Sequence, residues 1–432
     1  MQTTRRIVLA LTAGGAASVL AACGAGSQAT PQAAQQPVTL RHAVNTGATG
    51  FQVAERKVLE AFNRKGSHVT VQQEPISPPY PGILAQISAG TPPDVCLAHP
   101  RDSRVLLDAG GLEPLDEYMR KDRKNTPDIL PNVFGYFLQD GKQYFVPNNS
   151  APHAVYFNRT IFKQRGVKMP DEYEKEGKWN MDAFLDVARR TTGTVNDRRV
   201  WGTDWFWNQW DIQLAFIWPF GGDAWDKPNL NTVLDSKEAL EAIQYQADLT
   251  VKHQVSPTPD EKTANGGGAI FANGQIAMFI TTNAIVADFA GAAWEKGMAP
   301  VPAGRAGRIV RNVPNGIHVL KGGRHKEHAF EYANFQGGLE SEKIMLADQV
   351  TAPWHKSTLG SADYARALHP WQSAPYYAET VNKVRPTFYP SQNTEIQRLY
   401  GAAYTSVYTG QKTASIAVGE IKAQINDLLK KK

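Results

Sequence analysis

Short hydrophobic runs alternate with segments of helical periodicity over the first part of the chain. Residues 38–43 alternate polar and apolar side chains as a half-buried strand does, and residues 51–62 repeat apolar side chains at helical spacing. Residues 69–71 begin another strand, residues 81–89 have the pattern of a helix, and residues 94–98 form an apolar run typical of a buried strand. This alternation predicts an α/β fold in which helices cover both faces of a mostly parallel sheet.

Two further amphipathic helices are predicted on either side of a segment rich in tryptophan. One covers residues 182–190, and the other begins where Asp235 with Glu238 resembles a capping box and continues to residue 250. Between them, residues 201–225 hold six of the ten tryptophans of the chain. Such a concentration of large aromatic side chains indicates either a hydrophobic core or a ligand site built from flat apolar surfaces.

The length of the chain favours two lobes over one. The sequence has 432 residues, and a single hydrophobic core seldom extends beyond about 250 to 300 residues. Two lobes on one chain leave room for a ligand cleft between them.

The first 22 residues have the pattern of a secretory signal peptide. Arg5 and Arg6 precede an apolar run over residues 7–20, which small residues follow. This run is shorter than the roughly 20 residues that a membrane-spanning helix needs. Residues 4–9 also loosely resemble a twin-arginine export signal, so two export routes stay open.

The exit from the signal peptide resembles the lipobox of bacterial lipoproteins. Cys23 follows Leu20, Ala21 and Ala22, and the resemblance implies that its thiol is lipidated and that it becomes the first mature residue. Residues 23–37 then form an uncharged stretch rich in Ala, Gln and Pro, which indicates a flexible tether. The sequence therefore predicts secretion across the bacterial cytoplasmic membrane and a lipid anchor on its outer face, at the cell surface or in the periplasm.

Composition excludes other classes of protein. The formal net charge is +5, of which Arg5 and Arg6 in the signal peptide supply two, and the only basic run of the mature chain is at residues 430–432. Such a distribution lacks the electrostatic footprint of a nucleic-acid binder. If Cys23 is lipidated, Cys96 has no partner for a disulfide within the chain, and its apolar neighbours favour a buried structural role.

Seven short motifs follow one another in a fixed order along the mature chain. They occupy residues 89–95, 110–115, 140–147, 154–162, 178–184, 271–278 and 297–302. In this order they resemble the extracellular solute-binding proteins of ABC sugar importers, the family that includes maltose-binding protein. One departure is the absence of the family's Gly-x-Trp step after Met278, so a ligand-facing aromatic of that loop has no counterpart here.

The resemblance implies a two-lobed periplasmic-binding-protein-like fold with a hinge and a ligand cleft between the lobes. The family's hinge motifs place the crossings between lobes near residues 148, 281 and 314. The expected N-terminal lobe comprises residues 38–147 and 281–313, and the expected C-terminal lobe comprises residues 148–280 and 314–432.

The resemblance also implies the function. The protein is expected to be a monomeric lipoprotein that captures a monosaccharide, oligosaccharide or polyol and passes it to the permease subunits of an ABC transporter. Neither a cofactor nor a metal is expected. The absence of a basic cluster favours a neutral ligand, although Lys356 or Arg311 could bind a single phosphate, which makes glycerol phosphate esters the second choice.

The candidate ligand residues follow from the chemistry of sugars, which present apolar ring faces and many hydroxyl groups. Trp205 and Trp207 lie two residues apart, so a strand would place them on one face, and Trp225 follows a Gly-Gly-Asp turn. Each of these tryptophans could instead belong to the core. Trp354 lies in a segment that resembles the late cleft loop of the family.

Polar candidates come from the expected edges of the sheet and from the crossings. Ligands of parallel sheets bind where the strands end, which selects Asn45, Tyr80 and His99 after the first three strands. Asn148, Asn283 and Asn315 fall near the three expected crossings. The alternative interpretations are a structural hydrogen bond for His99 and turn positions for the asparagines.

Two other functions stay open. A secreted carbohydrate-active enzyme could use Asp204, Asp211 or Asp223 as paired carboxylates, but no hydrolase motif surrounds them. His325 and His328 are three residues apart without a third metal ligand. A sensor that presents ligand occupancy to a receptor would use the same fold as an importer subunit.

Overall fold

The computed structural model describes most of the mature chain. The described residues are 36–45, 49–76, 79–122, 128–139, 141–195, 197–205, 208–265, 267–312 and 314–431. The signal peptide, Cys23 and nearly all of the expected tether lie outside this range. Within it, no helix combines the length and apolarity needed to cross a membrane.

The first sheet has five strands in the order β2-β1-β3-β12-β6. They are β1 (Val38–Asn45), β2 (Val69–Ile76), β3 (Val95–Ala98), β12 (Gly316–Val319) and β6 (Phe145–Pro147). β1 is parallel to β2 and β3, whereas β12 is antiparallel to both β3 and β6. We call this sheet and its helices the first lobe.

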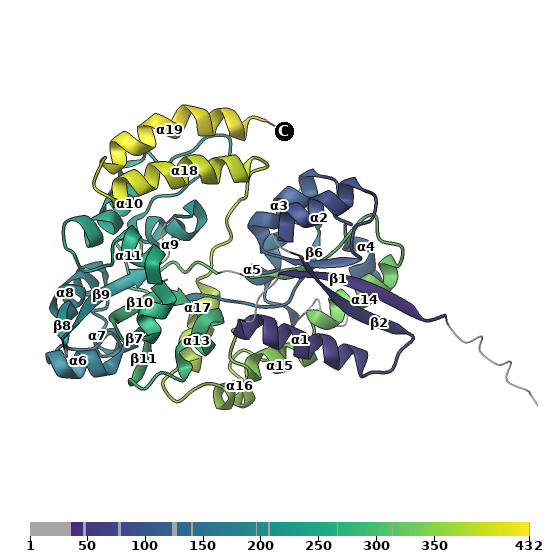
Figure 1. Cartoon of the computed structure of the whole chain (residues 1–432), viewed down its shortest axis with the longest axis horizontal. Helices are drawn as coiled ribbons and strands as arrows, with labels where there is room; N and C mark the ends of the chain where they lie inside the picture. Colours follow the sequence, from purple (N-terminus) through teal and green to yellow (C-terminus); the bar gives the residue numbers. More distant parts are fainter. Residues whose placement is uncertain are drawn as a thin grey trace, which may run out of the picture. The chain divides into compact units, whose positions relative to one another are not determined.

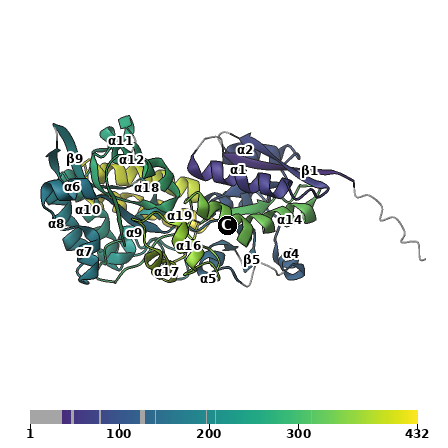
Figure 2. The same ribbon diagram turned by 90° about the horizontal axis from the view of Figure 1, so that it is seen from below.

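Helices from two distant parts of the sequence surround the first sheet, and Figures 1 and 2 show the green α14 on the same lobe as the purple α1. Leu40, Val95 and Ile317 of the sheet pack with Phe62 of α1 and Tyr332 of α14 in one core. The helices are α1 (Gly50–Asn63), α2 (Pro79–Ser88), α3 (Pro100–Asp108), α4 (Asp116–Lys121), α5 (Pro131–Phe134), α14 (Lys326–Gln336) and α15 (Leu339–Ala347), and β4 (Leu138–Gln139) pairs with β5 (Lys142–Gln143).

The second sheet has the order β11-β7-β10-β9-β8. Its strands are β7 (His153–Asn158), β8 (Gly193–Val195), β9 (Arg198–Trp205), β10 (Ile276–Thr282) and β11 (Lys296–Ala299). β10 lies parallel to β9 and antiparallel to β7. We call this sheet and its helices the second lobe.

The second lobe contains the larger set of helices, with α10, α18 and α19 packed together (Figure 1). The helices are α6 (Arg159–Arg165), α7 (Pro170–Lys175), α8 (Met181–Thr191), α9 (Trp210–Phe220), α10 (Lys237–Val251), α11 (Pro259–Asn265), α12 (Gly267–Ala272), α13 (Val286–Ala290), α16 (Ala362–Ala367), α17 (Ala374–Asn382), α18 (Asn393–Tyr408) and α19 (Ala414–Leu429).

The paths between the sheets differ from the expected lobe boundaries. The chain leaves the first sheet after Pro147 and enters the second at His153, near the first expected crossing. It stays in the second sheet through Ala299, because β11 pairs with β7, and returns to the first sheet at Gly316. The assignment of residues 281–313 to the N-terminal lobe and of the next segment to the C-terminal lobe is therefore wrong for β11, β12, α14 and α15. Strand partners are set by contacts far away in the sequence, which local motifs do not report.

Helix starts follow local chemistry, with one correction. The Thr49 side chain accepts a hydrogen bond from the Gln52 N–H at 3.4 Å, and the Gln52 side chain accepts one from the Thr49 N–H at 3.0 Å, which is a capping box at the start of α1. The capping box predicted at Asp235 is wrong. Ser236 caps α10 by accepting from the Ala239 N–H, and Asp235 pairs with Lys422 instead.

A buried polar cluster lies in the core of the first lobe, between β1, α1 and α14. The Tyr332 hydroxyl is 3.0 Å from His42 Nδ1, and Glu55 Oε1 is 3.9 Å from His42 Nε2. Burial raises the pKa of Glu55 to about 8 and lowers the pKa of His42 to about 3, because a charge is costly away from water. Both side chains are therefore uncharged in the folded protein near neutral pH.

We expect Glu55→Gln to remove a pH dependence of stability. The pKa of Glu55 is higher in the folded chain than in the unfolded one, so its contribution is complete below about pH 4 and is lost as the pH rises toward 8. Within this window the group should cost the wild type about 1.4 kcal/mol per pH unit. Urea unfolding at several pH values measures this slope. Glu60→Gln, which changes an exposed carboxylate of the same helix, is the control; equal slopes in wild type and Glu55→Gln contradict the assignment.

Candidate functional site

The strands of the first sheet end or begin at one common edge. In the strand register Asn45 pairs with Ile76, and Gly316 pairs with both Ala98 and Pro147. β1, β2 and β3 run parallel, and β6 shares their direction because both β3 and β6 are antiparallel to β12. The residues after β1, β2, β3 and β6 therefore start from the same edge, where parallel sheets bind their ligands.

Asn148 lies at this edge and is fully buried. Neither its Oδ1 nor its Nδ2 has a hydrogen-bond partner among the described residues. Its backbone N–H donates to the Asn315 carbonyl at 3.1 Å, so these two candidate residues lie side by side. A buried amide without partners is suited to the hydroxyl groups of a bound molecule, which both donate and accept.

The other candidates of the first lobe also lie near this edge. His99 caps α3, and its Nδ1 accepts a hydrogen bond from the Arg101 N–H at 3.1 Å. Asn45 is the last residue of β1. Tyr80 lies in the first turn of α2, where burial and the neighbouring Asp102 raise the pKa of its phenol, which donates a hydrogen bond to that carboxylate. The structure therefore brings together the candidates that the sequence assigned to strand ends.

The second sheet places Asn283 and Trp205 at its corresponding edge. His153, the first residue of β7, pairs with Thr282, the last residue of β10, and Trp205 is the last residue of the neighbouring β9. Asn283 follows β10 directly, is 1% exposed, and its Oδ1 has no partner among the described residues. Trp207 lies outside the described residues.

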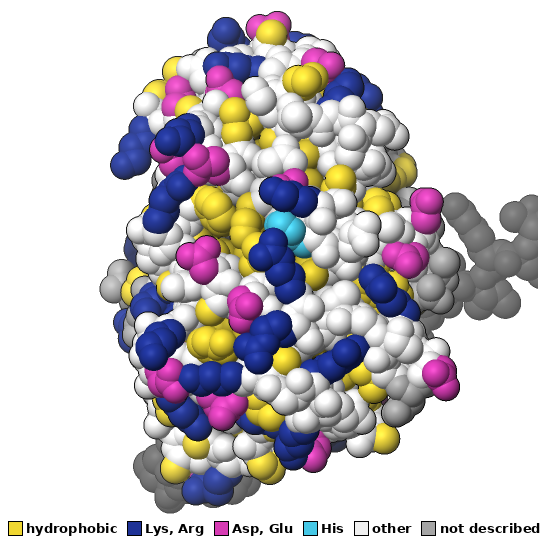
Figure 3. Space-filling model, turned by 90° about the vertical axis from the view of Figure 1, so that its left-hand side faces the viewer, with side chains coloured by type: hydrophobic (Ala, Val, Ile, Leu, Met, Phe, Trp, Pro, Cys, Tyr) yellow, Lys and Arg dark blue, Asp and Glu magenta, His cyan; other side chains and the backbone are white. Residues whose placement is uncertain are grey.

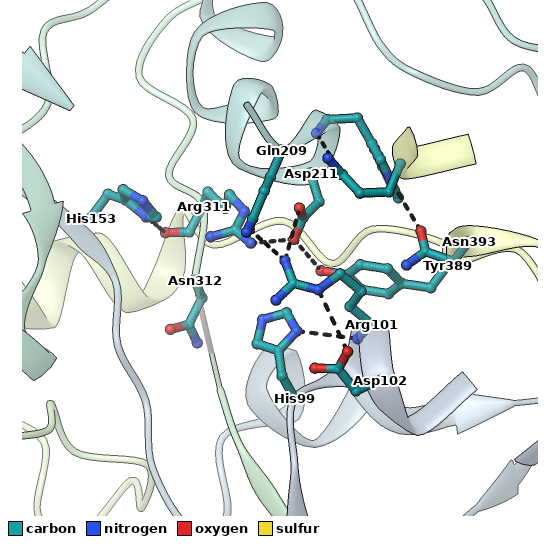
Figure 4. Close-up of polar contacts among 12 residues, drawn as sticks. His99, Arg101, Asp102, His153, Gln209, Asp211, Arg311, Asn312, Tyr389 and Asn393 are labelled. Atoms are coloured by element: carbon teal, nitrogen blue, oxygen red, sulfur yellow. Dashed lines mark hydrogen bonds and ion pairs between the residues drawn. The ribbon is translucent and has the colours of Figure 1, made fainter. Parts of the chain in front are cut away.

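Asp211 is the centre of a buried polar network between the two edges (Figure 4). It lies in the first turn of α9, and its Oδ2 accepts hydrogen bonds from Arg311 Nη2 at 2.6 Å and from the Tyr389 hydroxyl at 3.2 Å. Its Oδ1 is 3.5 Å from Arg101 Nη1. Burial alone would raise the pKa of Asp211, but the charges of Arg311 and Arg101 outweigh it and hold this pKa well below its usual value. We call these four residues, together with Gln209, the Asp211 network.

Arg101 connects the two lobes through this network. It lies in the first turn of α3 in the first lobe, and its Nη1 donates to Oε1 of Gln209, the residue before α9, at 2.5 Å. Figure 4 shows the guanidinium groups of Arg101 and Arg311 directed toward the Asp211 carboxylate from different segments of the chain. The edges of the two sheets therefore face each other across charged hydrogen bonds.

Two neutral histidines border the Asp211 network. Burial, reinforced by the charge of Arg101, lowers the pKa of His99 well below its usual value. Burial, reinforced by Arg311, lowers the pKa of His153 to about 3. His153 Nδ1 lies 3.0 Å from the Arg311 carbonyl, so this nitrogen holds the proton and donates it. The two rings add hydrogen-bonding groups to the site and no charge.

Trp225 and Trp354 require correction as ligand residues. The Trp225 ring packs against that of Trp210 with centres 4.8 Å apart, and its N–H donates to the Phe388 carbonyl at 3.1 Å. Trp354 is fully buried, and its N–H donates to the Gly337 carbonyl at 2.9 Å. Both rings belong to the core, where burial of their large apolar area stabilises the fold.

None of the five members of the Asp211 network was among the predicted ligand residues. The position of Arg101 could have suggested it as a site residue, because it lies two residues after His99, at the start of the helix that follows β3. Arg311 was considered only for a phosphate. Tyr389 lies in an irregular segment, and no local pattern marks it. Asp211 itself was considered only as one of three carboxylates of an enzyme.

The three carboxylates considered for a glycosidase have separate partners. Asp204 pairs with Lys262, and Asp223 accepts from the Trp218 indole N–H at 3.0 Å, whereas Asp211 is bound to the two arginines of its network. The structure therefore does not show them as one acid and base pair. Among the described residues, no group of three or more His, Cys, Asp or Glu side chains is arranged to hold a metal ion.

On one face of the molecule, exposed charges of both signs lie close together. Figure 3 shows one face on which Lys and Arg side chains lie among acidic and hydrophobic ones. Many exposed charges are paired locally, as in Arg190 with Asp186 at 3.5 Å and Lys178 with Glu176 at 3.3 Å.

Comparison with known proteins adds a family and a set of similar folds. The family model for bacterial extracellular solute-binding proteins matches residues 48–342. The ABC substrate-binding protein Lmo0181 from Listeria monocytogenes, solved with cycloalternan, has a TM-score of 0.81 and 21% identity, covering 91% of this chain and 99% of that one. The GacH receptor of Streptomyces glaucescens, solved unliganded and with acarbose, has a TM-score of 0.78 and 17% identity, covering 92% and 100%. MalE3 of T. maritima, solved with maltose, has a TM-score of 0.77 and 20% identity, covering 91% and 100%.

Proposed function

Since this chain belongs to the bacterial extracellular solute-binding protein family, we propose that it captures a carbohydrate outside the cytoplasmic membrane and delivers it to the permease subunits of an ABC importer. The observation that carries this proposal is Asn148, a buried amide whose donors and acceptor have no partner among the described residues, at the edge where the two lobes face each other. Such an amide is suited to sugar hydroxyls.

The ligand class is supported by the similar structures as well as by the site. Cycloalternan, acarbose and maltose are the ligands of the three similar proteins, and all are carbohydrates. In this chain, Asn148 and Asn283 offer amide groups. Arg101 and Gln209 offer polar groups from opposite lobes. Trp205, at the end of β9, is the proposed stacking residue. Aromatic faces and converging polar groups together are what a sugar requires.

The proposed mechanism is closure of the lobes around the ligand. The segments that connect the sheets run side by side, with the Asn148 N–H bonded to Asn315 and the His153 N–H bonded to Arg311. Such paired connecting segments can serve as a hinge, and contacts such as Arg101 with Gln209 form only when the lobes are together. Ligand binding then favours the closed arrangement because the ligand contacts both lobes.

A panel of carbohydrates tests the proposed function. We expect at least one monosaccharide, oligosaccharide or polyol to raise the melting temperature, since a ligand that binds only the folded chain stabilises it. Solution scattering should then show a smaller radius of gyration with the same ligand. Failure of every carbohydrate to bind in calorimetry contradicts the ligand class, and an unchanged radius with a bound ligand contradicts the closure.

We further propose that a lipid on Cys23 anchors the protein at the membrane surface. Cys23→Ala should release the protein into the soluble fraction, because a short tether without the lipid has no affinity for the bilayer. Cell fractionation with immunoblotting measures the distribution, and Cys96→Ala, which changes the buried cysteine, is the control. If Cys23→Ala fractionates with membranes as the wild type does, the lipid is not on this residue.

A further inference from the structure

The Asp211 network contains two positively charged side chains and only one negatively charged side chain. Two guanidinium groups, from Arg101 and Arg311, share the carboxylate of Asp211 at 3.5 and 2.6 Å. Arg101 has a second carboxylate nearby, since its Nε is 3.8 Å from Asp102. Among the described residues, Arg311 forms an ion pair with Asp211 alone. The positive charge of Arg311 is therefore the less compensated of the two.

Arg311 uses one of its three guanidinium nitrogens. Its side chain is 3% exposed, and Nη2 donates to Asp211. Nε and Nη1 are buried and have no hydrogen-bond partner among the described residues. A charged N–H left without an acceptor in a buried site is costly, and the acceptor that a guanidinium binds most strongly is an oxyanion.

The unused donors of Arg311 belong to the same pair of segments as Asn148. The Arg311 carbonyl accepts from the His153 N–H at 3.0 Å, and four residues along, the Asn315 carbonyl accepts from the Asn148 N–H at 3.1 Å. Because His153 and His99 are neutral, neither adds to nor cancels the charge of Arg311. Among the described residues, the site therefore combines a cation with two donors that lack acceptors and an amide whose side chain lacks partners.

We propose that the ligand is an acidic carbohydrate, with its carboxylate or phosphate bound by Nε and Nη1 of Arg311 and its hydroxyl groups bound by Asn148. This inference rests on the proposed function, that the ligand is a carbohydrate. It replaces the neutral ligand expected from the sequence, where no basic cluster is visible because Arg101 and Arg311 lie far apart along the chain. The fold brings both guanidinium groups to one carboxylate.

Calorimetric titration of the purified protein with matched sugars tests the inference. Each set contains one sugar as its neutral form, its uronate and its 6-phosphate, with glucose, galactose and mannose and the corresponding disaccharides as the sugars. We expect an acidic form to bind at least about tenfold more tightly than its neutral form, with an advantage that shrinks as salt is raised. The uronate and phosphate forms distinguish the two oxyanions.

Arg311→Gln should abolish the advantage of the acidic form over the neutral form of the same sugar, because glutamine keeps hydrogen-bonding capacity without the charge. Arg385→Gln, which changes a partly exposed arginine paired with Asp223, is the matched control and should keep the advantage. If Arg311→Gln does not fold, the affinities of the wild type for the acidic and neutral forms decide whether the inference holds. Neutral forms that bind as tightly as both acidic forms overturn this inference and leave the proposed function standing, whereas binding of no sugar in any form overturns both.

Discussion

Asp211→Asn is expected to lower the free energy of unfolding of the unliganded protein by about 3 kcal/mol, because it leaves the buried Arg311 guanidinium and the partly buried Arg101 guanidinium without their shared carboxylate. Asparagine has nearly the same volume as aspartate, so the loss measures charge and not packing. Urea unfolding near neutral pH, followed by circular dichroism, gives the free energy. Asp235→Asn is the control, because its partner Lys422 is partly exposed, and it should cost about 1 kcal/mol or less.

The pH dependence of the same variant separates charge from shape. The pKa of Asp211 is held below its unfolded value, so its contribution is present above about pH 4 and is lost as the pH falls below that value. The difference between wild type and Asp211→Asn should therefore shrink on acidification. A difference of the same size at acidic and neutral pH shows that the loss comes from altered packing and contradicts an ionic role.

Arg101→Gln is expected to weaken carbohydrate binding by about thirtyfold, because truncating one member of a partly buried, charged hydrogen-bond pair costs on the order of 2 kcal/mol. Arg101 is the side chain by which α3 of the first lobe contacts Gln209 and Asp211 of the second. Its loss removes bonds that form only when the lobes are together. Calorimetry measures the affinity, and scattering of the liganded variant should show a larger radius than that of the wild type.

The matched control for this prediction is Arg120→Gln, which changes an exposed arginine of α4 in the same lobe. It should leave affinity and radius unchanged. Arg101→Gln should weaken neutral and acidic sugars alike, unlike Arg311→Gln, because Arg101 connects the lobes whichever sugar is bound. Wild-type affinity in Arg101→Gln contradicts the assignment of this arginine to the closed site.

The local patterns of the sequence predicted elements well and their partners poorly. The apolar spacing over residues 51–62 predicted α1, and the apolar run at residues 94–98 predicted β3, because helical period and burial are properties of neighbouring residues. The pairing of β11 with β7, and the insertion of β12 beside β3, depend on contacts across the whole chain. The short motifs predict neither of these strand pairings, so the predicted lobe boundaries after residue 281 were wrong.

The sequence predicted residues at the strand ends and crossings, and their role in binding stays a prediction. His99 was selected as a strand end and Asn148 as a crossing residue, and the strand register places both at one edge of the first sheet. Trp225 and Trp354 failed because a tryptophan pattern does not distinguish a core from a binding surface, and here the indole N–H groups bond to backbone carbonyls. Arg311 was underestimated because its importance comes from Asp211, a hundred residues away in the sequence.

The position of β12 has a consequence for when the protein can fold. This four-residue strand lies inside the first sheet, between β3 and β6, although it is made long after both of them. Until the ribosome has added residues 316–319, β3 and β6 have no strand between them. The first lobe therefore cannot be completed before all five strands of the second sheet have been synthesised. Contacts of such long sequence separation form slowly. The nascent chain therefore stays without a completed first lobe during most of its synthesis, which leaves time for export machinery to engage it before it folds.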